Sequence, residues 1–156
     1  MQRAPWNRDR AQAIIDEHKH LDGAALPMLH ALQHEFGHIA EEALPLIAHT
    51  LNLTRAEVHG IVTFYHDFRR EPAGRHVLKL CRAEACQSRG GEALAAHAKA
   101  RLKLDWHDTD AIGSVTLEPV FCLGLCACAP AAMLDGRVIG RLDRARLDNL
   151  LDEAGR

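Results

Sequence analysis

The residues of this chain best suited to metal chemistry are four cysteines arranged in two short pairs. Cys81 and Cys86 are separated by four residues, Cys122 and Cys126 by three, and 35 residues lie between the two pairs. Thiolates bind both zinc and iron–sulfur clusters, and both kinds of site can use close pairs joined by a long insert. The spacing therefore predicts a metal site and leaves the metal open.

Several interpretations of the cysteines compete. A structural zinc site accepts both spacings, because paired zinc ligands are commonly separated by two to four residues. Dithiol–disulfide exchange normally uses C-x-x-C, which this sequence lacks, and four unliganded buried thiols would leave the pairing unexplained. No charged residue occurs from Val120 to Leu134, so we expect the pocket around Cys122 and Cys126 to be apolar and poor in water. Such surroundings favour a redox centre, because burial tunes its potential.

Other residues near the cysteines could assist such a site or replace a ligand. Arg82, Arg89 and a helix expected to start at Ser88–Gly91 can offer positive charge and free backbone N–H groups to thiolates. Cys128, two residues after Cys126, could replace a ligand, but we interpret it as a small buried apolar residue. The histidines at 30, 34 and 38 are spaced four apart, yet Gly37 interrupts their helix, so none is assigned as a ligand.

The composition is that of an ordinary globular protein. The 156 residues are 47% hydrophobic and 26% charged, and the net charge of −2 gives no indication of binding to nucleic acid or to an anionic membrane. The N-terminal segment has no apolar core of signal-peptide type, and the longest uncharged run, 16 residues, is too short to span a membrane. Five cysteines, an odd number, argue against a complete disulfide framework. We therefore expect a cytoplasmic protein.

The first part of the chain is predicted to be helical. Asn7 can cap a first helix that ends near Asp22–Gly23, and Gly37 can stop a second helix that carries Leu29, Leu32 and Phe36. A third helix should hold Leu44, Ile47 and Leu51, and a fourth begins at Thr54, where Thr54 and Glu57 have the form of a capping box. Pro72 and Gly74 mark a boundary, so we expect an N-terminal helical segment at 1–72 and a second domain at 73–156.

The second part is predicted to be a small α/β domain. We expect strands at His76–Leu80 and Val115–Val120, a helix from about Ser88 to Leu102, a hairpin turning at Asp135–Gly136, and a last helix capped by Asp143. The segment from Leu104 to Ser114 has no clear pattern. Both cysteine pairs follow the ends of strands, and sheets of this class place their sites there.

The motifs also resemble a known family. C-x4-C within LKLCRAEACQSRGGEAL and C-x3-C within TLEPVFCLGLCACAPAAMLDG are similar to those of the thioredoxin-like [2Fe–2S] ferredoxin family, which includes the 24-kDa-type subunit of respiratory complex I. The helical segment LNLTRAEVHGIVTFYHDFRREPAGRH resembles the family's N-terminal region, so the likeness covers nearly the whole chain. The segments CRAEACQS and CLGLCACAP, the second with a cysteine at position 128, most resemble those of the gamma subunit of NAD-dependent molybdenum formate dehydrogenases.

The resemblance implies a fold, a cofactor and partners. It implies a thioredoxin-like domain after the helical bundle, and one [2Fe–2S] cluster bound by Cys81, Cys86, Cys122 and Cys126. It implies an electron-transfer subunit with no substrate site of its own, beside a beta subunit that binds flavin (FMN) and NAD and an alpha subunit that oxidises formate at a molybdenum cofactor, with further Fe–S clusters in these partners. A complex I 24-kDa-type subunit, a subunit of an NAD-reducing hydrogenase, and a zinc-stabilised interaction module with four cysteine ligands remain the alternatives.

Two further expectations concern single features. Thioredoxin-like folds tend to place a cis proline before the strand that faces their redox loop, so we predict a cis Ala129–Pro130 peptide. The N-terminal helices exceed what a small sheet needs as cover, so we predict that residues 1 to about 70 dock onto a partner.

Overall fold

The computed structural model describes residues 4–155, which form two compact units that divide between Pro72 and Ala73. Whether these units fold as separate domains stays a prediction. The first unit contains four helices: α1 (Arg8–His18), α2 (Ala25–Phe36), α3 (Ala43–Leu51) and α4 (Arg55–Phe64). The second contains, in chain order, β1 (His76–Cys81), α5 (Glu84–Ser88), α6 (Gly91–Leu102), β2 (Val115–Val120), the 3-10 turn η1 (Cys126–Cys128), β3 (Ala132–Leu134), β4 (Arg137–Ile139) and α7 (Arg144–Ala154).

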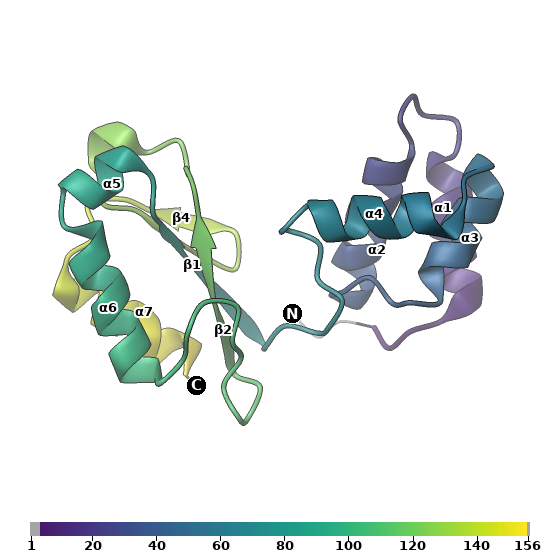
Figure 1. The fold of residues 1–156 in the computed structure, drawn as a ribbon. Helices are drawn as coiled ribbons and strands as arrows, with labels where there is room; N and C mark the ends of the chain where they lie inside the picture. Colours follow the sequence, from purple (N-terminus) through teal and green to yellow (C-terminus); the bar gives the residue numbers. More distant parts are fainter. Residues whose placement is uncertain (1–3, 156) are drawn as a thin grey trace. The chain divides into compact units, whose positions relative to one another are not determined.

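The helices of the first unit begin and end largely where the sequence predicts (Figure 1). The Asn7 side chain accepts the backbone N–H of Arg10 at 2.9 Å, and Thr54 and Glu57 form the predicted capping box at the start of α4. Gly37, with a φ of 80°, ends α2 in the left-handed conformation that glycine adopts without strain. Buried aliphatic side chains from all four helices make one core: Ile15, Leu32, Ile47 and Val58 among them.

The first helix is shorter than predicted. We expected α1 to reach Asp22–Gly23, but it ends at His18. Its last buried side chain is Ile15, and Leu21 is 41% exposed, so a further helical turn would bury little apolar surface.

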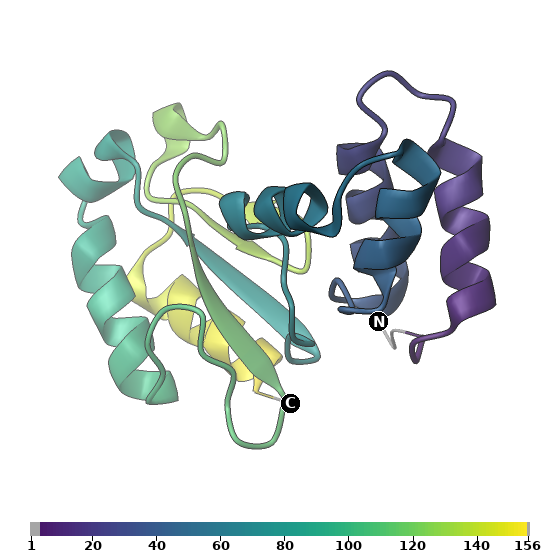
Figure 2. The ribbon, with the colours of Figure 1, turned by 45° about the vertical axis from the view of Figure 1, so that its right-hand side comes forward.

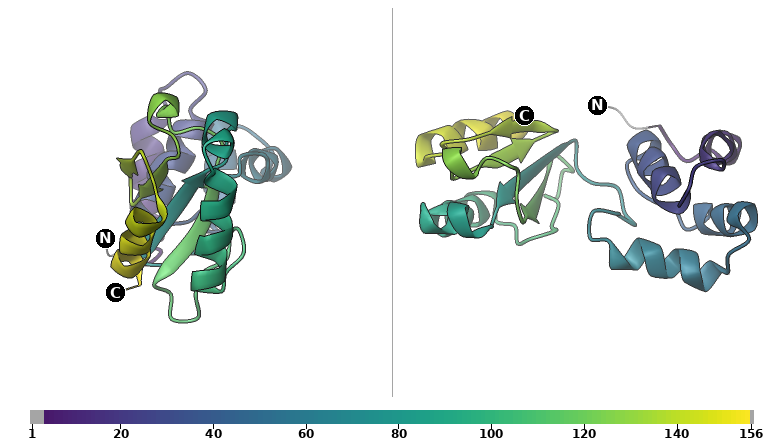
Figure 3. Two further views of the ribbon diagram at one scale, coloured as in Figure 1. Left: turned by 90° about the vertical axis from the view of Figure 1, so that its left-hand side faces the viewer. Right: turned by 90° about the horizontal axis from the view of Figure 1, so that it is seen from above.

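The second unit is a four-stranded sheet in the order β2-β1-β3-β4. Strands β1 and β2 are parallel, whereas β3 pairs antiparallel with both β1 and β4. Helices α6 and α7 pack side by side on one face of the sheet, as the left view of Figure 3 shows. Leu78, Leu117, Leu134 and Leu147 are buried between the strands and these helices. The mixed helix-and-sheet fold confirms the α/β prediction.

Two local predictions in this unit were wrong or incomplete. The helix expected from about Ser88 starts at Gly91, because the residues just before it form a separate short helix, α5, which turns the chain after β1. The unassigned segment at 104–114 follows the outer edge of β2: the His107 backbone N–H donates to the Leu117 carbonyl at 2.8 Å, and the Asp110 side chain accepts the backbone N–H of Val115 at 2.9 Å. These contacts are tertiary and leave no periodic pattern in the sequence.

The sheet brings the two cysteine-bearing loops together at one end of its strands (Figure 2). Because β1 and β2 are parallel, their carboxyl ends lie together, and Cys81 stands opposite Val120 in the register. None of the helices within residues 4–155 has the length and hydropathy needed to cross a bilayer.

Candidate metal centre

The first cysteine pair lies at the end of β1 and in the helix that follows. Cys81 is the last residue of the strand, and Cys86 lies in α5; their exposed fractions are 6% and 2%. The backbone N–H of Cys81 donates to the Ala131 carbonyl at 3.0 Å, and that of Arg82 donates to the Val120 carbonyl at 2.8 Å. These two bonds tie the first loop to both of the segments that flank the second one.

The second pair lies in the loop after β2 and is exposed. Cys122 follows the strand by two residues, and Cys126 begins η1. The Gly124 backbone N–H donates to the Cys122 Sγ at 3.3 Å, so an amide already points at this sulfur. The expectation of a pocket poor in water around these two residues was wrong. The aromatic side chain of the uncharged run, Phe121, is itself 71% exposed, and Leu123 and Leu125 pack against the buried pair Cys81 and Cys86.

The thiols interact electrostatically two by two. Burial raises the pKa of Cys86, and a hydrogen bond with Cys81 raises it further, while a hydrogen bond with the Ala131 backbone opposes the shift. A hydrogen bond with Cys122 is the largest cause of the raised pKa of Cys126. Cys126 also interacts through space with both Cys81 and Cys86. Each thiol pair therefore forms a unit, and the two units are neighbours.

Small apolar residues surround the buried pair. Cys81 and Cys86 form a cluster with Ala129 and Ala131, onto which Val120, Leu123 and Leu125 pack. The Ala129–Pro130 peptide that leads into this cluster is cis, as predicted. Gly91 closes the site from α6: a Cβ at this position would lie 2.6 Å from the Cys86 carbonyl oxygen. The sequence hints at this contact only through the adjacent glycines 90 and 91.

The remaining candidates make contacts of other kinds. Cys128 is half-buried, and its Cβ faces Gly140, where an added Cβ would lie 2.9 Å away. The His30 ring packs on Phe68 with centroids 4.9 Å apart, and His38 Nδ1 lies 3.2 Å from the Phe36 carbonyl oxygen. Among residues 4–155, no three His, Cys, Asp or Glu side chains converge on a point that could hold a single metal ion.

The arrangement fits a binuclear cluster, which takes two thiolates on each iron. Two neighbouring thiol pairs meet that need. A buried polar atom beside the site points the same way: Arg82, next to Cys81, has a buried Nε with no hydrogen-bond partner within the described chain. Buried donors are almost always satisfied, so this N–H is available to an acceptor on a bound group.

Comparison with known proteins places the chain in a family. Residues 11–155 match the family described as thioredoxin-like [2Fe-2S] ferredoxin. The chain belongs to this family. It therefore carries a [2Fe–2S] cluster and transfers electrons, and the zinc interpretation is set aside.

The relatives are subunits of larger enzymes. A NADH-quinone oxidoreductase subunit of Rhizobium meliloti is 36% identical over 93% of this chain and 86% of its own length. The NADP-reducing hydrogenase subunit HndA of Solidesulfovibrio fructosivorans is 29% identical over 96% of this chain and 86% of its own. A solved NAD+-reducing [NiFe]-hydrogenase in the H2-reduced state aligns with a TM-score of 0.70 at 28% identity over 81% of this chain, which spans only 22% of the hydrogenase chain.

Proposed function

We propose that this chain is the [2Fe–2S] electron-transfer subunit of an NAD-dependent oxidoreductase complex, with Cys81, Cys86, Cys122 and Cys126 as the cluster ligands. The observation that carries the proposal is the meeting of two thiol pairs at the carboxyl ends of two parallel strands. In such a site, two of these cysteines would hold each iron, and the cluster would supply one-electron chemistry.

The two cysteine pairs would have different roles: one would hold the cluster in the protein, and the other would leave it accessible at the surface. The buried pair, Cys81 and Cys86, anchors one side among small apolar side chains that exclude water. The exposed pair, Cys122 and Cys126, leaves the other side at the surface, where a partner can approach closely. Phe121, exposed beside Cys122, gives that partner an apolar contact.

We propose the gamma subunit of an NAD-dependent formate dehydrogenase as the specific role. The support is the resemblance of the segments CRAEACQS and CLGLCACAP, the second with a cysteine at position 128, to that subunit. The partners would be a beta subunit that binds flavin and NAD and an alpha subunit that contains molybdenum, in the cytoplasm. Two sister roles compete, because the relatives in the comparison are named as NADH-quinone oxidoreductase and hydrogenase subunits. In all three roles the cluster exchanges electrons with a neighbouring flavin subunit.

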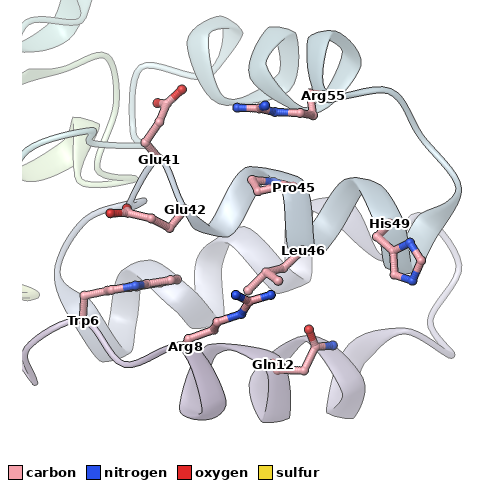
Figure 4. Close-up of a pocket in the computed structure, with 9 residues that line it drawn as sticks. All are labelled: Trp6, Arg8, Gln12, Glu41, Glu42, Pro45, Leu46, His49 and Arg55. Carbon is pink, nitrogen blue, oxygen red and sulfur yellow. The ribbon is translucent and has the colours of Figure 1, made fainter.

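We further propose that the first unit docks onto that flavin subunit. A surface pocket of about 630 Å³ lies between the start of α1, helix α3 and the start of α4. Figure 4 shows the side chains that line it. Trp6, Pro45 and Leu46 give it an apolar floor. Its rim carries charges of both signs that form no ion pair within the described residues: Arg8, Arg55, Glu41 and Glu42. A partner segment with an apolar side chain between a basic and an acidic one would complement this pocket.

The test is to purify the assembled complex through an affinity tag on this chain and to assay it with three electron donors. Formate-dependent NAD reduction that is lost without this chain would support the formate dehydrogenase role. H2-dependent NAD reduction or NADH-dependent quinone reduction would instead move the chain to one of the sister roles. A colourless isolated chain that contains zinc and gives no EPR signal on reduction would reject the electron-transfer role altogether.

Reversal of charge in the pocket tests the docking proposal. Arg8→Glu combined with Arg55→Glu should reduce co-purification of the flavin subunit while the chain keeps its iron content, because these side chains lie in the unit that lacks the cysteines. Arg144→Glu is the matched control, since it places the same change on the exposed surface of α7. Normal assembly of the double variant would refute the docking role of this pocket.

A further inference from the structure

We propose that the guanidinium of Arg82, held beside the cluster, raises the cluster's reduction potential. This inference rests on the proposed ligand set, because Arg82 directly follows Cys81. Nearby charge and hydrogen bonds to sulfur are among the factors that set the potential of an iron–sulfur centre.

The backbone of Arg82 is fixed from two sides. Its N–H donates to the Val120 carbonyl at 2.8 Å, which links it to the strand leading to Cys122. Its carbonyl accepts a hydrogen bond from the Gln87 Nε2 at 2.6 Å, which links it to the residue after Cys86. The main chain of Arg82 is thus held between the two cysteine-bearing loops.

The side chain is fixed as well. The Nη2 donates to the Glu92 Oε2 at 2.7 Å, in the first turn of α6, and the Cζ lies 5.4 Å from the centroid of the Trp106 ring. The Arg82 side chain is only 29% exposed, whereas that of Glu92 is 66% exposed. Solvent therefore screens the carboxylate more than the guanidinium, so we expect part of the positive charge of Arg82 to stay uncompensated.

The Nε–H of Arg82 adds a specific sign that the pair is incomplete. This atom is buried and has no acceptor within the part of the chain that the structure describes. A buried unpaired donor is costly, and sulfur carrying negative charge beside Cys81 would be a suitable acceptor. The ion pair with Glu92 uses Nη2 of Arg82 and leaves Nε without an acceptor, so this pair alone does not account for an arginine at this position.

The direction of the effect follows from charge. One-electron reduction by mediator dyes poised with dithionite adds one negative charge to the site and no proton. A fixed positive charge stabilises the reduced form more than the oxidised form, so Arg82 should shift the potential upward. The exposed carboxylate of Glu92 opposes part of this effect.

The experiment is a redox titration of the full chain, followed by the EPR signal of the reduced state, with iron content measured for each variant. Arg82→Gln should shift the potential downward. Arg82→Lys should keep the potential close to the wild-type value, because lysine keeps the positive charge. Glu92→Gln should shift the potential upward. Arg89→Gln is the matched control: Arg89 follows Cys86 by three residues but is exposed and forms no ion pair within residues 4–155, so its removal should leave the potential nearly unchanged.

Added salt gives a second readout. The shift caused by Arg82→Gln should persist at high ionic strength, because the charge is partly buried and so less screened. An unchanged potential in Arg82→Gln, with only reduced iron content or stability, would show a structural role and overturn the inference. If the wild-type chain itself gave no EPR signal, the proposed ligand set and function would fail instead, so the two failures are distinguishable.

Discussion

Replacement of Gly91 by alanine should damage the cluster site from outside it. The new Cβ would lie 2.6 Å from the Cys86 carbonyl oxygen and 2.9 Å from the Cys86 carbonyl carbon. Both distances are much shorter than an ordinary van der Waals contact, which begins near 3.4 Å. Both atoms belong to the backbone, so no side-chain rotation can relieve the clash. Either α6 must move away from α5, or the turn that carries Cys86 must move.

The magnitude follows from two opposing effects. Overpacking of a well-packed site costs about 1–3 kcal/mol. Alanine regains up to ~1 kcal/mol through its better helix propensity, and less than that at Gly91, which is the first residue of α6. We therefore expect a net loss of roughly 1–2 kcal/mol, which corresponds to a lower melting temperature by several degrees. Because either movement disturbs the contacts around Cys86, the variant should also lose iron faster than the wild type in the presence of a chelator.

The assay combines thermal unfolding by circular dichroism with iron and sulfide content per chain. Gly60→Ala is the matched control: this glycine lies inside α4, an added Cβ would meet no atom within 4 Å, and the change should stabilise the chain by up to ~1 kcal/mol without affecting iron. Full iron content and an unchanged melting temperature in Gly91→Ala would refute the close approach between α6 and the Cys86 turn.

Four further substitutions test other parts of the second unit. Cys128→Ser should keep the cluster whereas Cys126→Ala should lose or badly weaken it, as measured by iron content and the reduced-state EPR signal; the opposite pattern would reverse the ligand assignment. Gly140→Ala should destabilise the chain by ~1–3 kcal/mol, measured by thermal unfolding, because its Cβ would lie 2.9 Å from the Cβ and 3.0 Å from the carbonyl oxygen of Cys128. Asp148→Asn should lower the stability near neutral pH: its hydrogen bond with His97 at 2.7 Å holds the pKa of this carboxyl below its usual range. A lowered folded-state pKa stabilises the native protein above the unfolded-state pKa, and this gain disappears as the pH falls through the folded-state value. Urea unfolding should therefore separate the wild type from Asp148→Asn at pH 7 and bring the two together in strong acid; a constant difference would contradict the linkage.

Local signals made much of the fold predictable. The capping box at Thr54 and the caps at Asn7 and Asp143 depend on side chains within three residues of the groups they bind, so sequence alone predicts them. The hairpin at Asp135–Gly136 is predicted in the same way, and both residues adopt the positive φ that its turn requires.

Features that depend on tertiary contacts were missed. The segment from Leu104 to Ser114 takes its shape from hydrogen bonds to β2 and from Asp110, and these partners lie four or more residues away with no periodic pattern. The break between α5 and α6 depends on how closely Gly91 approaches Cys86, a distance set by packing. The sequence shows only that two glycines stand there.

The cysteine site combines both cases. The spacing of the cysteines predicted two pairs at strand ends, because parallel strands bring their carboxyl ends together. It did not predict that one pair would be buried and the other exposed, because an uncharged run indicates low polarity and not cover by other elements. This asymmetry matters for electron transfer. A site buried on all sides would hold its cluster out of reach of a partner, whereas the proposed ligand set would hold it firmly at Cys81 and Cys86 and leave a single face open at Cys122 and Cys126 for electron exchange. A partner that docked there, as we propose, would cover that face, so the polarity around the cluster, and with it the potential, would depend on assembly as well as on this chain.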